Sequence, residues 1–169
     1  MSMQDGLTGI ANRRRFDEAF ESVCRHAART GADIGILMLD VDHFKEYNDH
    51  YGHGAGDDAL RGVADVFSQY ARRPHDVVAR YGGEEFVVMS LAPQGFAQMA
   101  ERLKQDVFDL AIPHVRSKVS DRLTVSGGGL LAKLKDTSRS VELLHQADVL
   151  LYRAKEAGRN QIILERMVF

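Results

Sequence analysis

The sequence predicts an α+β domain in which helices pack on a mostly antiparallel central sheet. Short apolar runs alternate along the chain with amphipathic segments, in the order helix, strand, helices, two strands, helix, strand, helix, strand. The two consecutive runs are joined by a Gly-rich connection, which indicates a β-hairpin because glycine reaches the positive φ angles of a tight turn. This order of elements is typical of a sheet covered by helices.

Four segments carry apolar residues at helical spacing and are expected to be helices: 13–29, 57–70, 93–109 and 141–156. Asn12 suits an N-cap for the first helix, and Pro93 suits the first turn of the third. Gly158 is expected to end the last helix. Five apolar runs are expected to be strands: 34–39, 75–81, 84–90, 123–126 and 160–164. The glycine triplet 127–129 is expected to end the fourth strand.

Composition is that of one globular domain, which we expect to span residues 1–169. Of the residues, 44% are apolar and 27% are charged, and the net charge of −2 argues against a nucleic-acid polymer as partner. A single cysteine, Cys24, excludes an internal disulfide and fits a reducing compartment. The chain has no run of 18 apolar residues and no signal-peptide pattern, so we expect no membrane contact by this segment.

Two carboxylates, Glu84 and Glu85, follow Gly82 and Gly83 at the predicted hairpin turn. Adjacent carboxylates repel each other unless a cation lies between them. A turn with an acid pair and close backbone approach suits a divalent metal ion with a bound phosphate. Taken alone, the same pattern also fits a solvated acidic hairpin tip.

A second acidic pair, Asp40 and Asp42, follows the apolar run 34–39. Carboxylates at the end of a buried strand lie where folds of this kind open their binding crevices. Because side chains alternate along a strand, Asp42 is expected to point away from Asp40 and to serve the structure more than a metal. Oxygen ligands without cysteine or histidine at metal-binding spacing indicate magnesium rather than zinc.

These motifs together resemble the GGDEF domain of diguanylate cyclases, in the variant spelled GGEEF. The matching pieces occur in the family's order and cover about residues 5–164. They are Asp5-Gly6-Leu7-Thr8-Gly9 with Asn12-Arg13-Arg14, Leu39-Asp40-Val41-Asp42-His43-Phe44-Lys45, Asn48-Asp49 with Gly52-His53 and Gly56-Asp57, Arg80-Tyr81-Gly82-Gly83-Glu84-Glu85-Phe86, Ala147-Asp148, and Lys155-Glu156-Ala157-Gly158-Arg159-Asn160.

The resemblance implies a palm-like fold, shared with nucleotide cyclases and polymerases, and a nucleotidyltransferase that makes a bacterial second messenger. Such an enzyme condenses two GTP molecules into cyclic di-GMP and two pyrophosphates, with each 3′-hydroxyl attacking the α-phosphate of the other GTP. Asp40, Glu85 and the backbone carbonyl of Val41 are implied to hold one or two Mg²⁺ ions, with Mn²⁺ as the alternative. Glu84 is implied to act as general base and to share in metal binding. The division of roles between Glu84 and Glu85 stays open, because a turn can aim either one inward.

Substrate binding is implied for Phe44, Lys45, Asn48, Asp57, Gly82, Gly83, Lys155 and Arg159. Asn48 and Asp57 would recognise guanine, and the retained Asp57 disfavours ATP as substrate. Lys45, which is also implied to be catalytic, would contact the triphosphate with Lys155 and Arg159, because cations make charge-assisted bonds with phosphate oxygens. Two structural alternatives stay open, in which Asp57 only caps its helix and Arg159 only complements a helix dipole. His53 fits loop packing and site support equally well.

A regulatory motif, Arg73-Pro74-His75-Asp76, ends shortly before the hairpin turn. Its position resembles the family's inhibitory site, at which the product cyclic di-GMP binds. Arginine offers a planar fork for guanine or phosphate, and Asp76 can accept from the guanine amine. Taken alone, the motif also fits a surface salt bridge. Relatives often add an arginine from the following helix, where this chain has Lys104, so we expect weaker product binding.

Two functions of different class remain. The first is an active cyclase that works as a homodimer, with weak association in the isolated domain because this segment has no dimerising helix upstream. The second is an inactive module that binds GTP or cyclic di-GMP and signals through a partner. Loss of the acid pair or of Asp40 would favour the module, and both are retained. We expect a cytoplasmic protein, or the cytoplasmic domain of a larger sensory or membrane protein.

Overall fold

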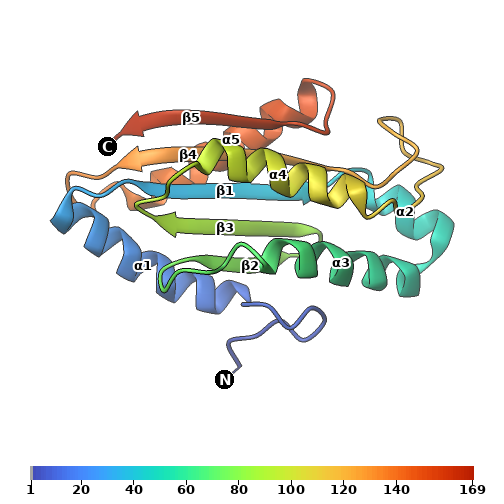
Figure 1. The fold of residues 1–169 in the computed structure, drawn as a ribbon, viewed down its shortest axis with the longest axis horizontal. Coiled ribbons are helices and arrows are strands. Elements are labelled where there is room, and N and C mark those ends of the chain that lie inside the picture. The colour runs from blue at the N-terminus through green and yellow to red at the C-terminus, as the bar shows by residue number, and fades with distance from the viewer. Residues whose placement is uncertain (1) are drawn as a thin grey trace.

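The computed structural model describes residues 2–169 and shows one five-stranded sheet between two layers of helices (Figure 1). Along the chain, the elements are α1 (Arg13–Thr30), β1 (Ile34–Val41), α2 (Phe44–Tyr51), α3 (His53–Ser68), β2 (Val77–Gly82), β3 (Glu85–Leu91), α4 (Phe96–Asp109), β4 (Val125–Lys133), α5 (Ser140–Glu156) and β5 (Ile162–Val168). The strand order is β2-β3-β1-β4-β5, and β4–β5 is the parallel pair in an otherwise antiparallel sheet. The predicted α+β fold with a mostly antiparallel sheet is confirmed.

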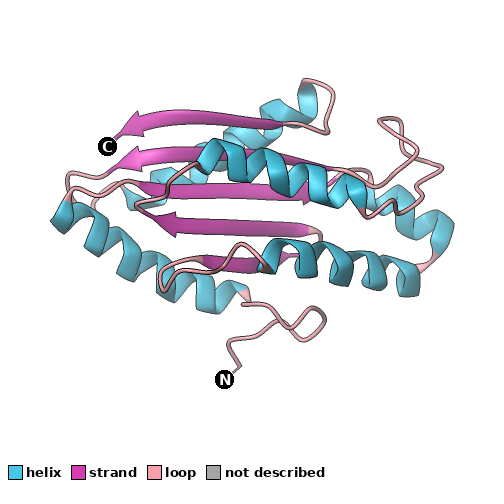
Figure 2. Ribbon diagram, viewed as in Figure 1, coloured by secondary structure: helices cyan, strands magenta, loops and turns pink. Residues whose placement is uncertain are grey.

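The central strand β1 is buried along its whole length, because helices cover both faces of the sheet (Figure 2). Alternate side chains enter two separate cores. Ile36 and Met38 pack in the core with residues of α1 and α5. Leu37 and Leu39 pack in the other core with residues of α3 and α4. The continuous apolar run in the sequence reflects this burial on both faces.

Helix boundaries differ from the predicted ones around the site. Asn12 caps α1 as predicted, accepting a hydrogen bond from the Arg15 amide at 3.0 Å. The sequence did not predict the short helix α2, and α3 begins at His53 rather than Asp57. The alternative in which Asp57 is the N-cap of α3 is therefore wrong, since it lies inside the helix. Pro93 also precedes its helix, because α4 begins only at Phe96.

The prediction that Gly127–Gly129 end the fourth strand is wrong, because β4 continues through them to Lys133. The reason is the close packing of α5 on this strand. A Cβ atom on Gly128 would lie 2.0 Å from the backbone nitrogen of Leu151. Glycine at this position thus lets a helix backbone approach a strand, and β5 lies beside the same strand at Ile162–Val168.

No helix among residues 2–169 is both long enough and apolar enough to cross a bilayer.

Candidate functional site

The predicted acids meet at one end of the sheet, where β1 finishes beside the β2–β3 turn. Asp40 lies directly opposite Glu85 in the antiparallel register of β1 and β3. The amide of Val41 donates to the carbonyl of Glu84 at 3.2 Å, which ties the turn to the strand end. Opposed positions in an antiparallel pair bring Cβ atoms within about 5.5 Å. Two like charges are thus held close together, an arrangement that costs free energy unless a cation neutralises them.

Burial and mutual repulsion act on the protonation of these acids. Asp40 is only 5% exposed. Its pKa is raised to about 6, chiefly by burial and also by the charges of Glu84 and Glu85, while the bond and charge of Lys155 oppose the rise. Burial also raises the pKa of Glu85, with added repulsion from Asp148. The folded chain therefore holds carboxylates whose charge it only partly compensates.

Lys155 reaches from α5 to the strand end, where its Nζ forms an ion pair with Oδ2 of Asp40. Asp148, about two helical turns earlier in α5, lies close enough for its charge to raise the pKa of Glu85. The sequence showed Asp148 as part of a family motif, but we did not predict a site role for it. Its approach to Glu85 depends on how α5 packs, which no local pattern reveals.

A pocket of about 490 Å³ opens beside the acid turn and contains most of the predicted substrate residues. Its lining is Phe44, Lys45, Asn48, Asp49, His53, Asp57, Leu60, Arg80, Gly83 and Glu84. The structure thus brings the implied guanine residues of α2 and α3 to the same hollow as the hairpin turn. Asp40, Val41 and Lys155 lie at the strand end next to that turn.

Asn48 fits against α3 only because residue 56 is glycine. A Cβ atom on Gly56 would lie 1.8 Å from Oδ1 of Asn48. The same oxygen is buried and has no hydrogen-bond partner within residues 2–169. An unpaired buried amide is unusual and is a reason to expect a ligand nearby. Gly56 therefore permits a polar side chain at the pocket wall.

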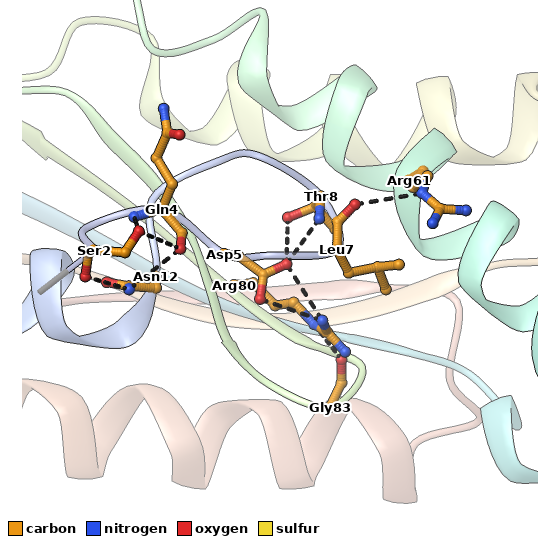
Figure 3. Close-up of polar contacts among 9 residues, drawn as sticks. All are labelled: Ser2, Gln4, Asp5, Leu7, Thr8, Asn12, Arg61, Arg80 and Gly83. Atoms are coloured by element: carbon orange, nitrogen blue, oxygen red, sulfur yellow. Dashed lines mark hydrogen bonds and ion pairs between the residues drawn. The ribbon is translucent and has the colours of Figure 1, made fainter.

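Arg80, which also lines the pocket, joins the acid turn to the N-terminal segment through a hydrogen-bond network (Figure 3). Its Nε donates to the carbonyl of Gly83 at 2.8 Å, and its Nη1 contacts both carboxylate oxygens of Asp5 at 3.3 Å. Thr8 donates to Asp5 through its amide and hydroxyl at 2.9 and 2.7 Å. Burial opposes ionisation of Asp5, but the bonds from Thr8 and the charge of Arg80 hold its pKa below the usual value. The sequence showed both motifs, but nothing in it pairs residues 75 positions apart.

The same N-terminal turn also contacts α3, because Nε of Arg61 donates to the carbonyl of Leu7 at 3.3 Å (Figure 3). One short segment therefore contacts both the acid turn and the helix that carries Asp57.

The oxygen donors at the strand end suit a Mg²⁺ ion bound together with substrate better than a metal ion held by protein ligands alone. Within residues 2–169, no three His, Cys, Asp or Glu side chains form a ready metal-binding group. Mg²⁺ is usually bound by one or two carboxylates together with substrate phosphates and water, rather than by a cage of side chains. Asp40, Glu85 and the Val41 carbonyl offer hard oxygen atoms of this kind, and a cation would offset the repulsion that Glu84 and Glu85 exert on Asp40.

The Arg73–Asp76 motif lies away from the acid turn and is bonded to its own chain. The guanidinium of Arg73 donates to the carbonyls of Leu91 and Ala92 at 2.6 and 3.1 Å. Asp76 accepts from the Ser90 hydroxyl at 2.7 Å and from the Arg73 amide at 3.0 Å. The alternative of an Arg73–Asp76 side-chain salt bridge is not what the structure shows.

A pocket of about 620 Å³ extends along Arg73 and Asp76 to α4. Arg102 of α4 lines it with them, whereas Lys104 is paired with Glu101 at 3.0 Å. An arginine of α4, Arg102, is therefore present at this pocket, although the sequence had indicated only Lys104 from this helix.

The chain is similar to known proteins over nearly its full length. It is 36% identical over 163 residues to the probable diguanylate cyclase DgcC of Escherichia coli, covering 95% of this chain and 43% of DgcC. It is 37% identical over 164 residues to the diguanylate cyclase VdcA of Vibrio cholerae, covering 94% of this chain and 46% of VdcA. The chain thus spans less than half the length of either relative.

Solved structures agree with the sequence relatives. The GGDEF domain of DgcB from Caulobacter crescentus, determined in complex with c-di-GMP, superposes with a TM-score of 0.86 at 34% identity. The match covers 97% of this chain and 96% of that one. The family model described as "Diguanylate cyclase, GGDEF domain" matches residues 2–161. The chain therefore belongs to the GGDEF domain family of diguanylate cyclases.

Proposed function

We propose that this chain is a diguanylate cyclase domain that condenses two GTP molecules into cyclic di-GMP and two pyrophosphates. The observation that carries the proposal is the cross-strand pair Asp40–Glu85 beside a pocket lined by Lys45, Asn48 and Asp57. Carboxylates whose charge is only partly compensated, next to a pocket with a lysine and an amide in its lining, suit a metal-bound nucleoside triphosphate. The similarity to DgcC and VdcA supports the same reaction.

Guanine recognition is assigned to Asp57 and Asn48, which line the pocket from α3 and α2. A carboxylate can accept from the ring N1–H and the exocyclic amine of guanine, a pair of donors that adenine does not present. Asn48 supplies an amide that can donate and accept. This arrangement favours GTP over ATP.

Phosphate binding is assigned to three cations, Lys45, Lys155 and Arg159. Charge-assisted bonds to phosphate oxygens neutralise the triphosphate and fix its orientation. Phe44, Gly82 and Gly83 complete the proposed substrate contacts, the glycines by allowing close backbone approach. Lys155 pairs with Asp40 in the free chain. With substrate and metal bound, the charge of Lys155 would act on both the Asp40 carboxylate and the phosphates.

Acid–base chemistry is assigned to the turn. Asp40, Glu85 and the Val41 carbonyl would hold Mg²⁺, which when bound offsets phosphate charge and favours ionisation of the attacking hydroxyl. Glu84 lines the pocket and is placed to accept the proton of that 3′-hydroxyl. The raised pKa of Glu85 makes it a stronger base than an ordinary glutamate.

The product contains two guanosines joined by two identical linkages, whereas the site described has one pocket. The simplest complete site is formed by two copies facing each other across a two-fold axis. Specific activity should therefore rise with enzyme concentration, and a tandem fusion of two copies should be more active at low concentration. Specific activity that stays flat over about a hundredfold range of concentration, in a protein shown to be monomeric, contradicts this arrangement.

We propose that the product cyclic di-GMP binds at Arg73 and Asp76 and inhibits the enzyme. Arg102 lines the same pocket. A cationic pocket with an acid partner suits a guanine dinucleotide, and the structural relative DgcB was determined with c-di-GMP. We place the domain in the cytoplasm, where GTP is available.

The direct test is incubation of the protein with GTP and Mg²⁺, with nucleotides resolved by chromatography and identified by mass spectrometry. Cyclic di-GMP and pyrophosphate in a 1:2 ratio are expected, together with no product from ATP. Binding of GTP without turnover, at every enzyme concentration and with Mg²⁺ or Mn²⁺, would instead identify a binding module.

A further inference from the structure

Asp42 is a buried carboxylate whose two oxygens are both occupied. It lies two residues after Asp40 and is 2% exposed. Oδ1 accepts from the Ser126 hydroxyl at 2.6 Å, and Oδ2 accepts from the Thr124 hydroxyl at 2.7 Å. Oδ2 also accepts from the backbone amide of Asn160 at 3.1 Å. The carboxylate thus joins the end of β1 to the start of β4 and to the α5–β5 loop.

The α5–β5 loop has an unusual backbone at the point that Asp42 contacts. Gly158, Arg159 and Asn160 have φ values of 118°, 61° and 48°, all in the left-handed region. Glycine adopts this region freely, but an arginine rarely does so. Such a conformation persists only where surrounding contacts enforce it. The contacts around Arg159 therefore decide its geometry.

Hydrogen bonds fix the backbone of the loop on both sides of Arg159. Its own amide donates to the carbonyl of Ala154 at 3.0 Å, which ends α5. The next amide, that of Asn160, is held by Asp42 and by the Ser126 hydroxyl, each at 3.1 Å. Without the second pair of bonds, the backbone after Arg159 could return to an ordinary conformation and redirect its side chain.

Arg159 does not line the pocket in the free chain, and the proposed function assigns it to the triphosphate. The bond from the Asn160 amide to Asp42, at 3.1 Å, places this loop close to His43, the N-cap of α2. Phe44 and Lys45, which line the pocket, are the next two residues. Arg159 and Lys45 therefore approach the same end of the site from different elements.

We propose that Asp42 is a positioning residue for triphosphate binding, acting by holding the left-handed backbone that aims Arg159 at the pocket. The inference rests on the proposed function, in which Arg159 contacts the triphosphate. Asp42 itself touches no substrate, because its side chain is buried and both its oxygens are engaged by the chain. Its charge strengthens the bond to the Asn160 amide, since charge-assisted hydrogen bonds are stronger than neutral ones.

The test measures affinity for a GTP analogue with a methylene bridge between the α- and β-phosphorus atoms, by calorimetry with Mg²⁺ at constant protein concentration. Arg159→Ala serves as the benchmark, with an expected loss of about tenfold or more in affinity. Asp42→Asn keeps the size of the side chain but removes the charge and one acceptor. It should lose affinity in the same direction, and the double variant should bind no more weakly than Arg159→Ala alone.

Thr124→Val is the matched control, because it removes one hydroxyl from Asp42 and leaves the Asn160 bond in place. This variant should lower the melting temperature while keeping the analogue affinity. Ser126→Ala is a second probe, since it removes the other acceptor of the Asn160 amide. It should reduce affinity in the same direction, which keeps the proposal testable even if Asp42→Asn fails to fold.

The outcomes separate the two proposals. Unchanged affinity in Arg159→Ala would reject its assigned phosphate contact, and with it this inference. A loss in Arg159→Ala with none in Asp42→Asn, or with none in Ser126→Ala where Asp42→Asn does not fold, would reject the positioning role alone. Additive losses in the double variant would show that Asp42 acts independently of Arg159, which also overturns the inference.

Discussion

The two ends of the β2–β3 hairpin carry charged residues in opposite states. At the turn, Glu84 and Glu85 face Asp40, and the pKa values of Asp40 and Glu85 are raised. At the other end, the side chains of Arg73 and Asp76 are bonded to carbonyl and hydroxyl groups of the same chain. The carboxylates at the turn therefore repel each other and would be stabilised by a cation. The side chains of Arg73 and Asp76, in contrast, already have hydrogen-bond partners.

This difference indicates what each end needs from a ligand. A ligand at the turn gains free energy by relieving repulsion that the fold imposes. A ligand at Arg73 and Asp76 must use the donors and acceptors that remain, or replace existing bonds and lose their contribution. We therefore expect loss of an acid at the turn to reduce activity but not stability. Loss of the Arg73 side chain should instead reduce stability but not activity.

The largest effect is expected for removal of an acid at the turn. Asp40→Asn or Glu85→Gln should reduce cyclic di-GMP formation by at least about a thousandfold, because electrostatic groups at a reacting centre have effects of this size. Neither variant should lower the melting temperature, since each removes a charge that burial disfavours. Turnover is measured by chromatography and unfolding by circular dichroism.

Asp136→Asn is the control, because this acid is exposed and bonds only to nearby Ser138. It should leave turnover unchanged. A well-folded Asp40→Asn protein that retained turnover would remove Asp40 from the metal site, and an unfolded one would make Asp40 a structural residue.

The second effect is a pH dependence of stability without metal. The folded pKa of Asp40, about 6, lies above its usual 3.8, so the folded state binds the proton more tightly than the unfolded state. Raising the pH from about 4 to about 6 should therefore lower the free energy of unfolding by about 2 kcal/mol from this group. Denaturant unfolding at a series of pH values measures the change.

Asp40→Asn should flatten this part of the profile, and Mg²⁺ should restore stability above pH 6 because the ion binds the ionised carboxylate. A profile that Asp40→Asn leaves unaltered would show that other groups control the transition.

The third effect concerns the satisfied end of the hairpin. Arg73→Ala removes bonds to two carbonyls and should cost about 1–3 kcal/mol of stability. It should also weaken binding of cyclic di-GMP more than tenfold, because truncating one partner of a charged contact costs about 2–5 kcal/mol. Calorimetric titration with cyclic di-GMP measures the affinity.

Arg102→Ala separates the loss of product binding from the loss of stability, since Arg102 lines the same pocket from α4. It should weaken cyclic di-GMP binding with little loss of stability. Unchanged product affinity in Arg73→Ala, Asp76→Ala and Arg102→Ala would leave this motif with a structural role alone.

The sequence predicted much of the acid turn because its signals are local. Glycines at a turn, continuous apolar runs and acids at the end of a buried strand each lie within a few positions, so the hairpin and β1 were found where predicted. The fold class followed from the same order of elements.

Features that depend on packing were not predictable in this way. Gly128 was expected to mark the end of a strand. Glycine is needed there because the α5 backbone approaches closely, which a single sequence does not show. The bonds of Arg73 to Leu91 and Ala92 join segments whose proximity follows from the β2–β3 register. For the same reason, the pairing of Asp5 with Arg80 appeared only in the structure.

The smallest effect is expected at that pairing, which acts on the turn without touching the acids. Both side chains are largely buried, with exposures of 18% for Asp5 and 19% for Arg80. Asp5→Asn should weaken the contact to Arg80 and loosen its hold on the Gly83 carbonyl, lowering kcat by about threefold to tenfold, as loss of roughly 1 kcal/mol implies. Because Asp5 does not line the pocket, KM should stay near its original value. A double-mutant cycle with Arg80→Lys measures the coupling, and Asp17→Asn, at an exposed position of α1, is a control. If Arg80→Lys lowers turnover while Asp5→Asn does not, Arg80 acts on the substrate directly and the N-terminal segment has no part in shaping the turn.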